Sequence, residues 1–182
     1  MPTFPLSLDD ELSALLTDEP SSDPPAAPVP PARVGERLMA SVGWLERFTP
    51  LAPVAAEALG TDVREARQAL HLLSDATGWM EIPLLPGVRI RPVTGRGGRE
   101  LPGALFAEVQ PGGGLPRHAH RGEGDEVMLV LQGALREVER PDLVVGPGGS
   151  LRSSEDSEHT LEATGDEVCF CLVVHGGWAD YL

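Results

Sequence analysis

The chain has 182 residues and a formal net charge of −14, because 28 acidic residues outnumber 14 basic ones. Every basic residue is an arginine, and no basic stripe is available to neutralise a phosphate backbone, so we expect no direct binding to nucleic acid. No apolar run approaches the roughly 18 residues that cross a bilayer, and the first residues lack the pattern of a secretion signal. These features predict a cytoplasmic protein that does not enter a membrane.

The first part of the chain is predicted to be an extension. Leucines within residues 8–16 recur at helical spacing and predict a short amphipathic helix. Residues 19–31 read EPSSDPPAAPVPP and have no apolar periodicity, which is typical of an extended linker. We therefore expect residues 1–35 to form a mobile N-terminal extension with a short helix and a proline-rich linker.

Residues 36–80 are predicted to be a helical segment. Apolar residues keep helical spacing up to Thr49-Pro50, and a second helix over 51–59 would end at Gly60, a residue that caps helices well. Thr61 or Asp62 can begin a third helix. Its apolar face would carry Val63, Ala66, Leu70 and Leu73.

After Trp79 the sequence changes to short runs of valine, leucine and isoleucine, separated by glycine and proline. This pattern is typical of many short antiparallel strands, so we predict a mainly β domain over residues 81–182, closed as a barrel or sandwich. The predicted strands are 88–93, 104–109, 126–132, 134–140, 143–145, 150–153 and 168–175.

Two histidines in this region, His118 and His120, are spaced i and i+2, so both imidazoles leave the same face of a strand. Glu126 and then His159 follow along the chain. Three imidazoles and one carboxylate suit a divalent metal ion. Because a His-x-His pair is common by chance, a metal-free barrel that binds a sugar or an acid is the alternative.

The spacing resembles the first motif of the cupin superfamily, in which a glycine precedes His-x-His by five residues and a glutamate precedes a second glycine by six. Gly112 and Gly133 stand at these positions, although five residues separate His120 from Glu126, a longer loop than the family's. Pro147-Gly148-Gly149, followed by His159, resembles the second motif. The resemblance implies a double-stranded β-helix, or jelly-roll. It implies four metal ligands: His118, His120, Glu126 and His159. Glu123 is the alternative carboxylate ligand.

Within the superfamily, residues 85–176 resemble the cupin half of ChrR-type anti-sigma factors, through HRGE, VMLVLQGAL, EDSEHT and the strand Cys-Phe-Cys-Leu at 169–172. In that group a helical N-terminal domain binds zinc and masks a sigma factor, and the cupin binds a second metal and senses oxidants. The region before the barrel in this chain has no cysteine and only one histidine, His71. The N-terminal zinc module is therefore absent.

Cys169 and Cys171 alternate with Phe170, so both thiols share one face of the last predicted strand. They are interpreted either as small buried apolar residues or as a redox-active pair near the metal. Arg117 and Arg121 flank the histidine pair, where they could neutralise nearby carboxylates or bind an anionic ligand.

The leading functional hypothesis is a metal-binding, ChrR-like regulator of transcription or sensor of oxidative stress. Its acidic surface would engage a sigma factor or another basic protein, and a homodimer is one alternative for its assembly. The rival hypothesis is a metal-dependent enzyme of the dioxygenase or isomerase type that acts on a small acid or thiol. Zinc is the favoured metal, with iron, manganese and nickel as alternatives.

Overall fold

The computed structural model describes residues 32–121, 124–176 and 178–181. The predicted helix at 8–16 and the linker at 19–31 lie outside these residues. The chain divides into two units, residues 1–39 and 40–182, and every strand belongs to the second. None of the described helices has both the length and the apolarity needed to cross a membrane.

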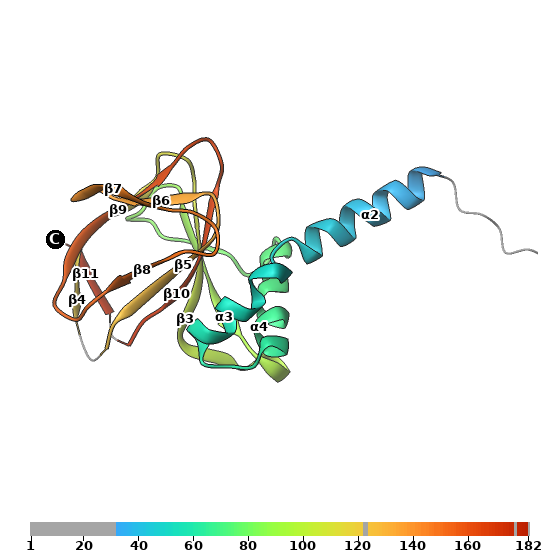
Figure 1. Cartoon of the computed structure of the whole chain (residues 1–182), viewed down its shortest axis with the longest axis horizontal. Coiled ribbons are helices and arrows are strands. Elements are labelled where there is room, and N and C mark those ends of the chain that lie inside the picture. Colours follow the sequence, from blue (N-terminus) through green and yellow to red (C-terminus); the bar gives the residue numbers. More distant parts are fainter. Residues whose placement is uncertain (1–31, 122–123, 177, 182) are drawn as a thin grey trace, which may run out of the picture. The chain divides into compact units, whose positions relative to one another are not determined.

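Helices come first in the described chain and strands follow (Figure 1). The α-helices are α2 (Ala32–Glu46), α3 (Ala52–Leu59) and α4 (Val63–Leu70), and the 3-10 helices are η1 (Thr49–Leu51), η2 (His71–Ser74) and η3 (Arg96–Gly98). The strands are β1 (Met80–Glu81), β2 (Val88–Thr94), β3 (Glu100–Val109), β4 (Gly114–Arg121), β5 (Glu126–Gln132), β6 (Ala134–Glu137), β7 (Arg140–Val145), β8 (Ser150–Ser153), β9 (Glu158–Thr164), β10 (Cys169–Val174) and β11 (Trp178–Tyr181).

The ends of α3 and α4 are set by local sequence, as predicted. Gly60 ends α3 in the left-handed conformation, with φ at 64°. Asp62 caps α4, because its carboxylate accepts a hydrogen bond of 2.8 Å from the backbone N–H of Glu65. Val63 was expected on the buried face, but this first residue of α4 is 50% exposed.

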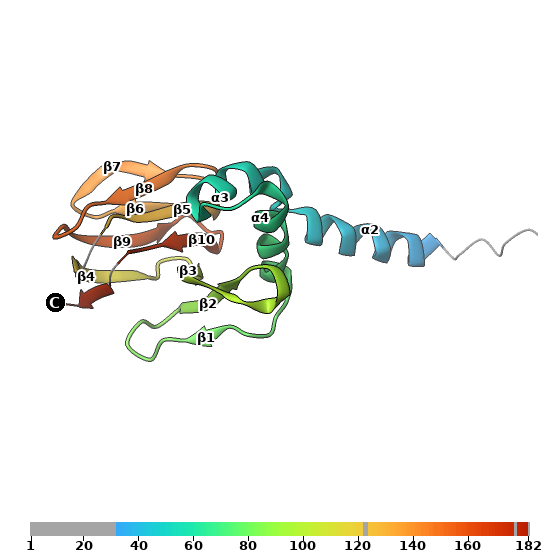
Figure 2. The same ribbon diagram turned by 90° about the horizontal axis from the view of Figure 1, so that it is seen from below.

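The strands form two antiparallel sheets. The six-stranded sheet has the order β1-β2-β3-β10-β5-β8, and the five-stranded sheet has the order β11-β4-β9-β6-β7. The chain crosses between the sheets repeatedly, so that neighbours in a sheet are often distant in sequence, as for β3 and β10 (Figure 2). This arrangement confirms the predicted mainly β, antiparallel fold with helices before it.

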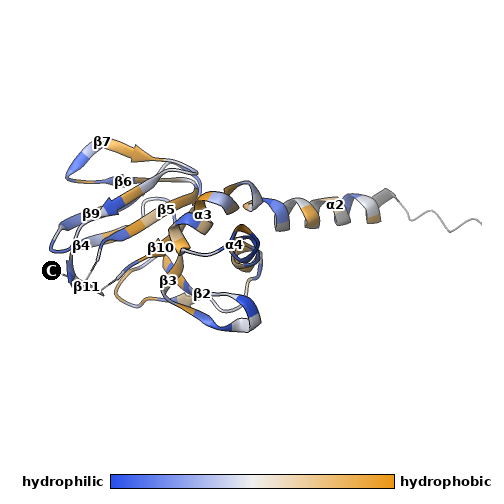
Figure 3. Cartoon of the chain, turned by 60° about the horizontal axis from the view of Figure 1, so that its bottom comes forward, coloured by the Kyte–Doolittle hydropathy of each residue, from blue (hydrophilic) through white to orange (hydrophobic). Residues whose placement is uncertain are grey.

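Side chains from both sheets meet in an inner core, which we define as the cluster that includes Ala107, Met128, Val130, Leu135, Leu151, Leu161, Ala163, Cys169, Cys171 and Val173. The other face of the six-stranded sheet packs against α3 and α4 in an outer core, through residues such as Phe106, Leu131, Phe170 and Leu172. Strand β10 is therefore buried on both faces. Its residues alternate between the two cores, which explains why its sequence is apolar throughout (Figure 3).

Candidate metal centre

Three strands bring the four expected ligands to one end of the barrel. His118 and His120 lie two residues apart on β4 and leave the same face of the strand. His159 on β9 pairs directly with His118 across the antiparallel ladder. Glu126 is the first residue of β5, in the other sheet. The cluster therefore joins the two sheets.

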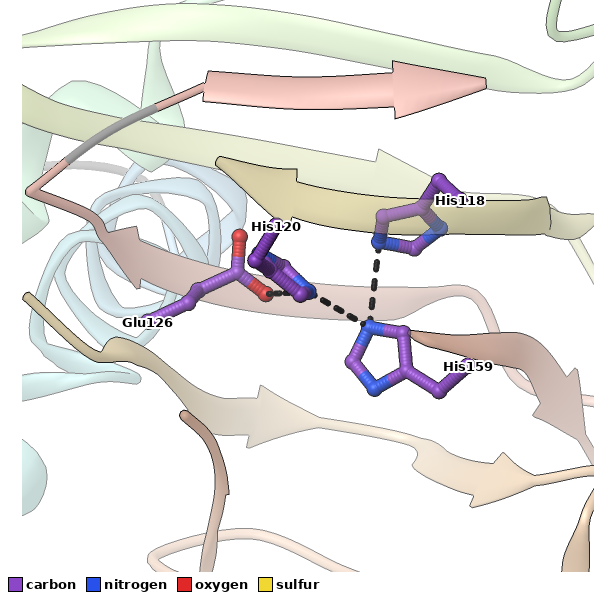
Figure 4. A group of neighbouring side chains, drawn as sticks. All are labelled: His118, His120, Glu126 and His159. Carbon is purple, nitrogen blue, oxygen red and sulfur yellow. Dashed lines mark hydrogen bonds and ion pairs between the residues drawn. The ribbon is translucent and has the colours of Figure 1, made fainter. Parts of the chain in front are cut away.

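The four side chains point toward one another (Figure 4). Nε2 of His159 lies 3.0 Å from Nε2 of His118 and 3.0 Å from Nε2 of His120. Oε1 of Glu126 lies 3.9 Å from Nε2 of His120. One ligand atom from each of the four residues lies within 4.8 Å of all the others. This spacing is compatible with four atoms around one small cation.

Contacts of the Nδ1 atoms of His118 and His159 determine which ring nitrogen faces the cluster with a lone pair. Nδ1 of His118 lies 2.9 Å from the carbonyl oxygen of Pro116. A carbonyl can only accept, so Nδ1 carries the proton and Nε2 presents its lone pair to the cluster. Nδ1 of His159 lies 3.0 Å from Oγ of Ser153, which can accept its proton in the same way. Such outer contacts are typical of histidines that bind metals.

Burial keeps the histidines in the state that binds metal. The pKa of His118 and of His120 is lowered, in each case mainly by burial. Burial, together with the neighbouring His118 and His120, lowers the pKa of His159 to about 4. At neutral pH the three imidazoles are therefore uncharged. Burial raises the pKa of Glu126 to about 7, so its carboxylate ionises readily once a cation is near.

Glu139 fixes the strand that carries His159. It lies in the turn between β6 and β7, and its carboxylate accepts hydrogen bonds from the backbone N–H of Thr160 at 2.9 Å and from the Thr160 hydroxyl at 2.7 Å. The backbone N–H of Val138 donates to the carbonyl oxygen of Thr160 at 2.9 Å. The turn is thus attached to β9 one residue after His159. Glu139 and Ser153 belong to no sequence motif, so their contacts with β9 could not be predicted from the sequence.

A cavity of about 150 Å³ adjoins the cluster between the two sheets. Its polar lining consists of His118, His120, Arg121, Glu126 and His175. Aliphatic side chains form most of its wall: Ile82, Val88, Ile90, Leu105, Ala107, Leu115, Met128 and Val173. A cation bound by the cluster would therefore have one side open to an apolar space.

The other residues singled out in the sequence lie outside the cluster. Cys169 and Cys171 are completely buried in the inner core, and their sulfur atoms are 3.6 Å apart. Arg117 pairs with Glu158 at 2.6 Å, and Arg121 approaches Asp156 at 3.4 Å.

Of the remaining candidates, His71 belongs to η2, where its Nε2 lies 3.9 Å from Oε1 of Glu46. His175 follows the end of β10 and lines the cavity. Glu123, the alternative carboxylate ligand, lies outside the described residues.

Comparison with known proteins identifies the fold. Residues 105–175 match the family described as "Cupin domain". No curated protein sequence matches the chain.

Solved structures with similar folds include an RmlC-like cupin protein from Ralstonia eutropha JMP134. It has 22% identity and a TM-score of 0.43, and the match covers 54% of this chain and 62% of that protein, less than two thirds of its length. The structure of Rhodobacter sphaeroides SigE in complex with the anti-sigma ChrR matches with 26% identity and a TM-score of 0.46, over 91% of this chain and 75% of that one. KdgF from Halomonas sp. matches with 21% identity and a TM-score of 0.41, over 53% and 84%.

Proposed function

We propose that residues 105–175, the part of the chain that matches the cupin domain family, bind one divalent metal ion through His118, His120, Glu126 and His159. The observation that carries this proposal is the convergence of the four ligand atoms within 4.8 Å. When Nδ1 of His159 donates to Ser153, as Nδ1 of His118 does to Pro116, the Nε2 lone pairs of His118 and His159 face each other at 3.0 Å. A cation resolves this contact.

Zinc is the metal we propose, because three nitrogen ligands and one carboxylate oxygen are common around it. Iron, manganese and nickel accept the same ligands, so the metal must be identified by measurement. Once bound, a metal would supply a Lewis acid that polarises or fixes an anionic oxygen.

Elemental analysis of purified variants tests the site. We expect about one metal ion per chain in the unmodified protein, and less than a tenth of that in His118→Ala and His159→Ala, because each removes a nitrogen ligand. His71→Ala is the matched control, since His71 lies outside the cluster. Stoichiometric metal in both cluster variants would overturn the assignment.

For the role of the metal we propose a regulator of the ChrR-like type, in which the cupin domain responds to metal loss or oxidation and the chain binds a basic protein such as a sigma factor. The support is the sequence resemblance over residues 85–176 and the net charge of −14. Binding to an extracytoplasmic-function sigma factor should weaken strongly as salt rises and should differ between metal-loaded and metal-free protein. Absence of binding at low salt would contradict this role.

The cysteine pair is part of the regulatory proposal. Peroxide would oxidise the two thiols to a disulfide and be reduced to water, and the separation of 3.6 Å between the sulfur atoms brings them close enough to react. The hydrogen bond with Cys169 and burial raise the pKa of the Cys171 thiol well above its usual range, so the reaction should be slow in the folded protein. Metal release by peroxide that persists in Cys169→Ser and Cys171→Ser would exclude the pair from sensing.

The second candidate is an enzyme, and the cavity beside the cluster favours it. An enzyme of the dioxygenase or isomerase type needs a small-molecule space at the metal, and His118, His120 and Glu126 line such a space. A bound iron, manganese or nickel ion that turns over a small acid would support this candidate. A zinc ion that peroxide releases would support the regulator.

A further inference from the structure

Strand β4 contains an extra residue just before the two histidines of the cluster. Leu115 and His118 are three residues apart along β4, whereas the residues of β9 that pair with them are two apart. Pro116 and Arg117 therefore share a single opposite residue, Thr160. Two residues opposite one define a β-bulge, a feature that often re-aims a side chain beside a functional site.

The bulge determines which side chains of β4 face inward. Residues three apart on a regular strand lie on opposite faces. Leu115 and His118 nevertheless both line the cavity between the sheets, and His120 lines it too. Pro116 and Arg117, which lie between them, are both exposed. The extra residue thus places an apolar side chain and both histidines on the same inner face, where the histidines point into the cluster (Figure 4).

The bulge also changes the direction of a carbonyl group. In a regular strand the backbone carbonyls lie in the plane of the sheet and point to neighbouring strands, whereas side chains stand perpendicular to it. The carbonyl oxygen of Pro116 instead lies 2.9 Å from Nδ1 of His118. Proline has no backbone N–H, so this position of the bulge leaves no donor without a partner.

The contact with Pro116 gives His118 a fixed tautomer. The carbonyl oxygen can only accept, which keeps the ring proton on Nδ1 and leaves the lone pair of Nε2 toward the cluster. His159 differs, because its Nδ1 contacts the hydroxyl of Ser153, a group that can either donate or accept. Of these two histidines, His118 is the one whose tautomer is set by the backbone.

We propose, on the basis of the metal site proposed above, that Pro116 is a positioning residue for that site. Its carbonyl, turned out of the ladder by the bulge, holds His118 in the tautomer that binds metal. Arg117 contributes through its place in the backbone, because its side chain is 64% exposed and pairs with Glu158. The side chain of Arg117 should therefore be dispensable, whereas the residue itself should not.

Deletion of Arg117 tests this role, with Arg117→Ala as the matched control that keeps the bulge. In the deletion, His118 still faces inward, because it then follows Leu115 by two positions. The carbonyl of Pro116, however, returns to the plane of the sheet and leaves the ring. Zinc titration at pH 8 should show affinity about tenfold to 100-fold lower in the deletion, and unchanged affinity in Arg117→Ala. Equal affinities of the two variants would overturn the proposal.

The nitrogen-15 signals of the His118 ring give a second readout, because protonated and unprotonated ring nitrogens have well-separated chemical shifts. The signals are assigned by their loss in His118→Ala. In metal-free protein at pH 8 we expect the proton on Nδ1 in the unmodified chain and in Arg117→Ala, and a mixture of both tautomers in the deletion. A proton on Nε2 of His118 in the unmodified chain would overturn the proposal. A variant that only destabilised the fold would not change this tautomer.

Pro116→Ala decides the question if the deletion does not fold. Alanine keeps the carbonyl but removes the restriction that proline places on φ, so the carbonyl is held less firmly against His118. We expect zinc affinity to fall by about threefold to tenfold, together with the appearance of the other His118 tautomer. Pro141→Ala, at an exposed position of β7, is the matched control. Identical results for these two variants would overturn the proposal.

The two readouts distinguish the positioning role from the metal site itself. Unmodified protein that binds no zinc but keeps the His118 proton on Nδ1 would overturn the metal site and retain the role of the Pro116 carbonyl. Protein that binds one zinc ion with the same affinity in every variant would overturn the positioning role alone.

Discussion

Glu126 is the acidic member of the cluster. Burial disfavours its ionised form when no cation is bound, whereas a bound cation favours that form. Its side chain is 11% exposed, and burial raises its pKa from 4.5 to about 7. Without metal, the folded protein therefore holds this carboxylate at a cost above pH 7. With metal, the same carboxylate is a ligand whose negative charge stabilises the bound ion.

In the metal-free protein, Glu126→Gln should therefore raise the free energy of unfolding at pH 8 and change it little at pH 4. The folded pKa is raised above the unfolded value, so the wild-type carboxyl loses stability as the pH rises from 4.5 through 7. A rise of the pKa from 4.5 to about 7 corresponds to about 3 kcal/mol at pH 8. Urea denaturation of both proteins at the two pH values, in the presence of a chelator, measures it.

Metal affinity should change in the opposite sense. Glu126→Gln should bind zinc at least tenfold more weakly than the unmodified protein at pH 8, because a ligand is lost. An equal change in stability at pH 4 and pH 8, or unchanged zinc affinity, would show that Glu126 is neither buried as a carboxylate nor a ligand.

At the scale of single elements, the pairing of β4 with β9 determines whether His118 faces His159. Gly114 begins β4 where the two strands approach most closely. A Cβ atom at this position would lie 2.2 Å from the carbonyl oxygen of Leu161 and 3.1 Å from Cα of Glu162, both in the backbone of β9. The pairing of β4 with β9, which carries the histidines, therefore requires a glycine at position 114.

Gly114→Ala should lower the free energy of unfolding by about 2–3 kcal/mol and weaken zinc binding, because the added methyl group forces β4 away from β9. Gly146→Ala is the matched control, since its Cβ meets nothing within 4 Å and its φ is not positive. Thermal denaturation and zinc titration measure both effects. Equal stability of the two variants would contradict the close approach.

The turn between β6 and β7 supports the same pair of strands from the other edge of β9. Glu139→Ala should weaken zinc binding by roughly threefold to tenfold, because Thr160 loses the acceptor for its N–H and hydroxyl next to His159. Glu139→Gln keeps an amide oxygen and should recover most of this loss. Zinc titration of the unmodified protein, Glu139→Gln and Glu139→Ala should give affinities that fall in this order. Identical affinities would mean that the turn does not position His159.

The sequence predicted the elements whose apolar pattern is strong. Strand β5 was predicted at its observed bounds of 126–132, because its apolar run lies between acidic residues and Gly133, and β8 was predicted at 150–153, directly after the glycines of its preceding turn. Strand β9 was missed, although His159, Leu161 and Ala163 alternate with exposed or half-buried polar residues. Its inward face is only three residues long, too short for the pattern to stand out.

The predicted strand at 134–140 is wrong in its bounds. The chain turns at 138–139, so β6 ends at Glu137 and β7 begins at Arg140. No glycine or proline marks this turn, and local sequence therefore could not reveal it. The structure brings together the four residues that the family motif implies as ligands, whereas Ser153 and Glu139 act through contacts that depend on the folded register.

At the scale of the whole molecule, the two cores differ in what they contain. The outer core packs helices α3 and α4 against the six-stranded sheet with large side chains such as Phe48, Phe106 and Phe170. The inner core contains the cavity of about 150 Å³ and the cluster of uncharged histidines. A bound metal would connect β4, β5 and β9 beside this cavity.

Zinc should therefore stabilise the whole domain. At a free zinc concentration of about 1,000 times the dissociation constant, the free energy of unfolding should rise by about 4 kcal/mol, provided that the unfolded chain does not bind zinc. Calorimetric or fluorescence melting with zinc and with a chelator measures this change. His159→Ala should melt at the same temperature in both conditions, and a shift in that variant equal to the wild-type shift would place the zinc elsewhere.

The pairing of His118 with His159 also has a mechanical consequence. The two residues are 41 positions apart, so a metal that holds both rings closes a loop of that length. If the two ends of the domain were pulled apart in an optical trap, the residues inside this loop would bear no force until a metal–ligand bond breaks. Its release would lengthen the chain by about 140 Å, as a separate step that a chelator removes.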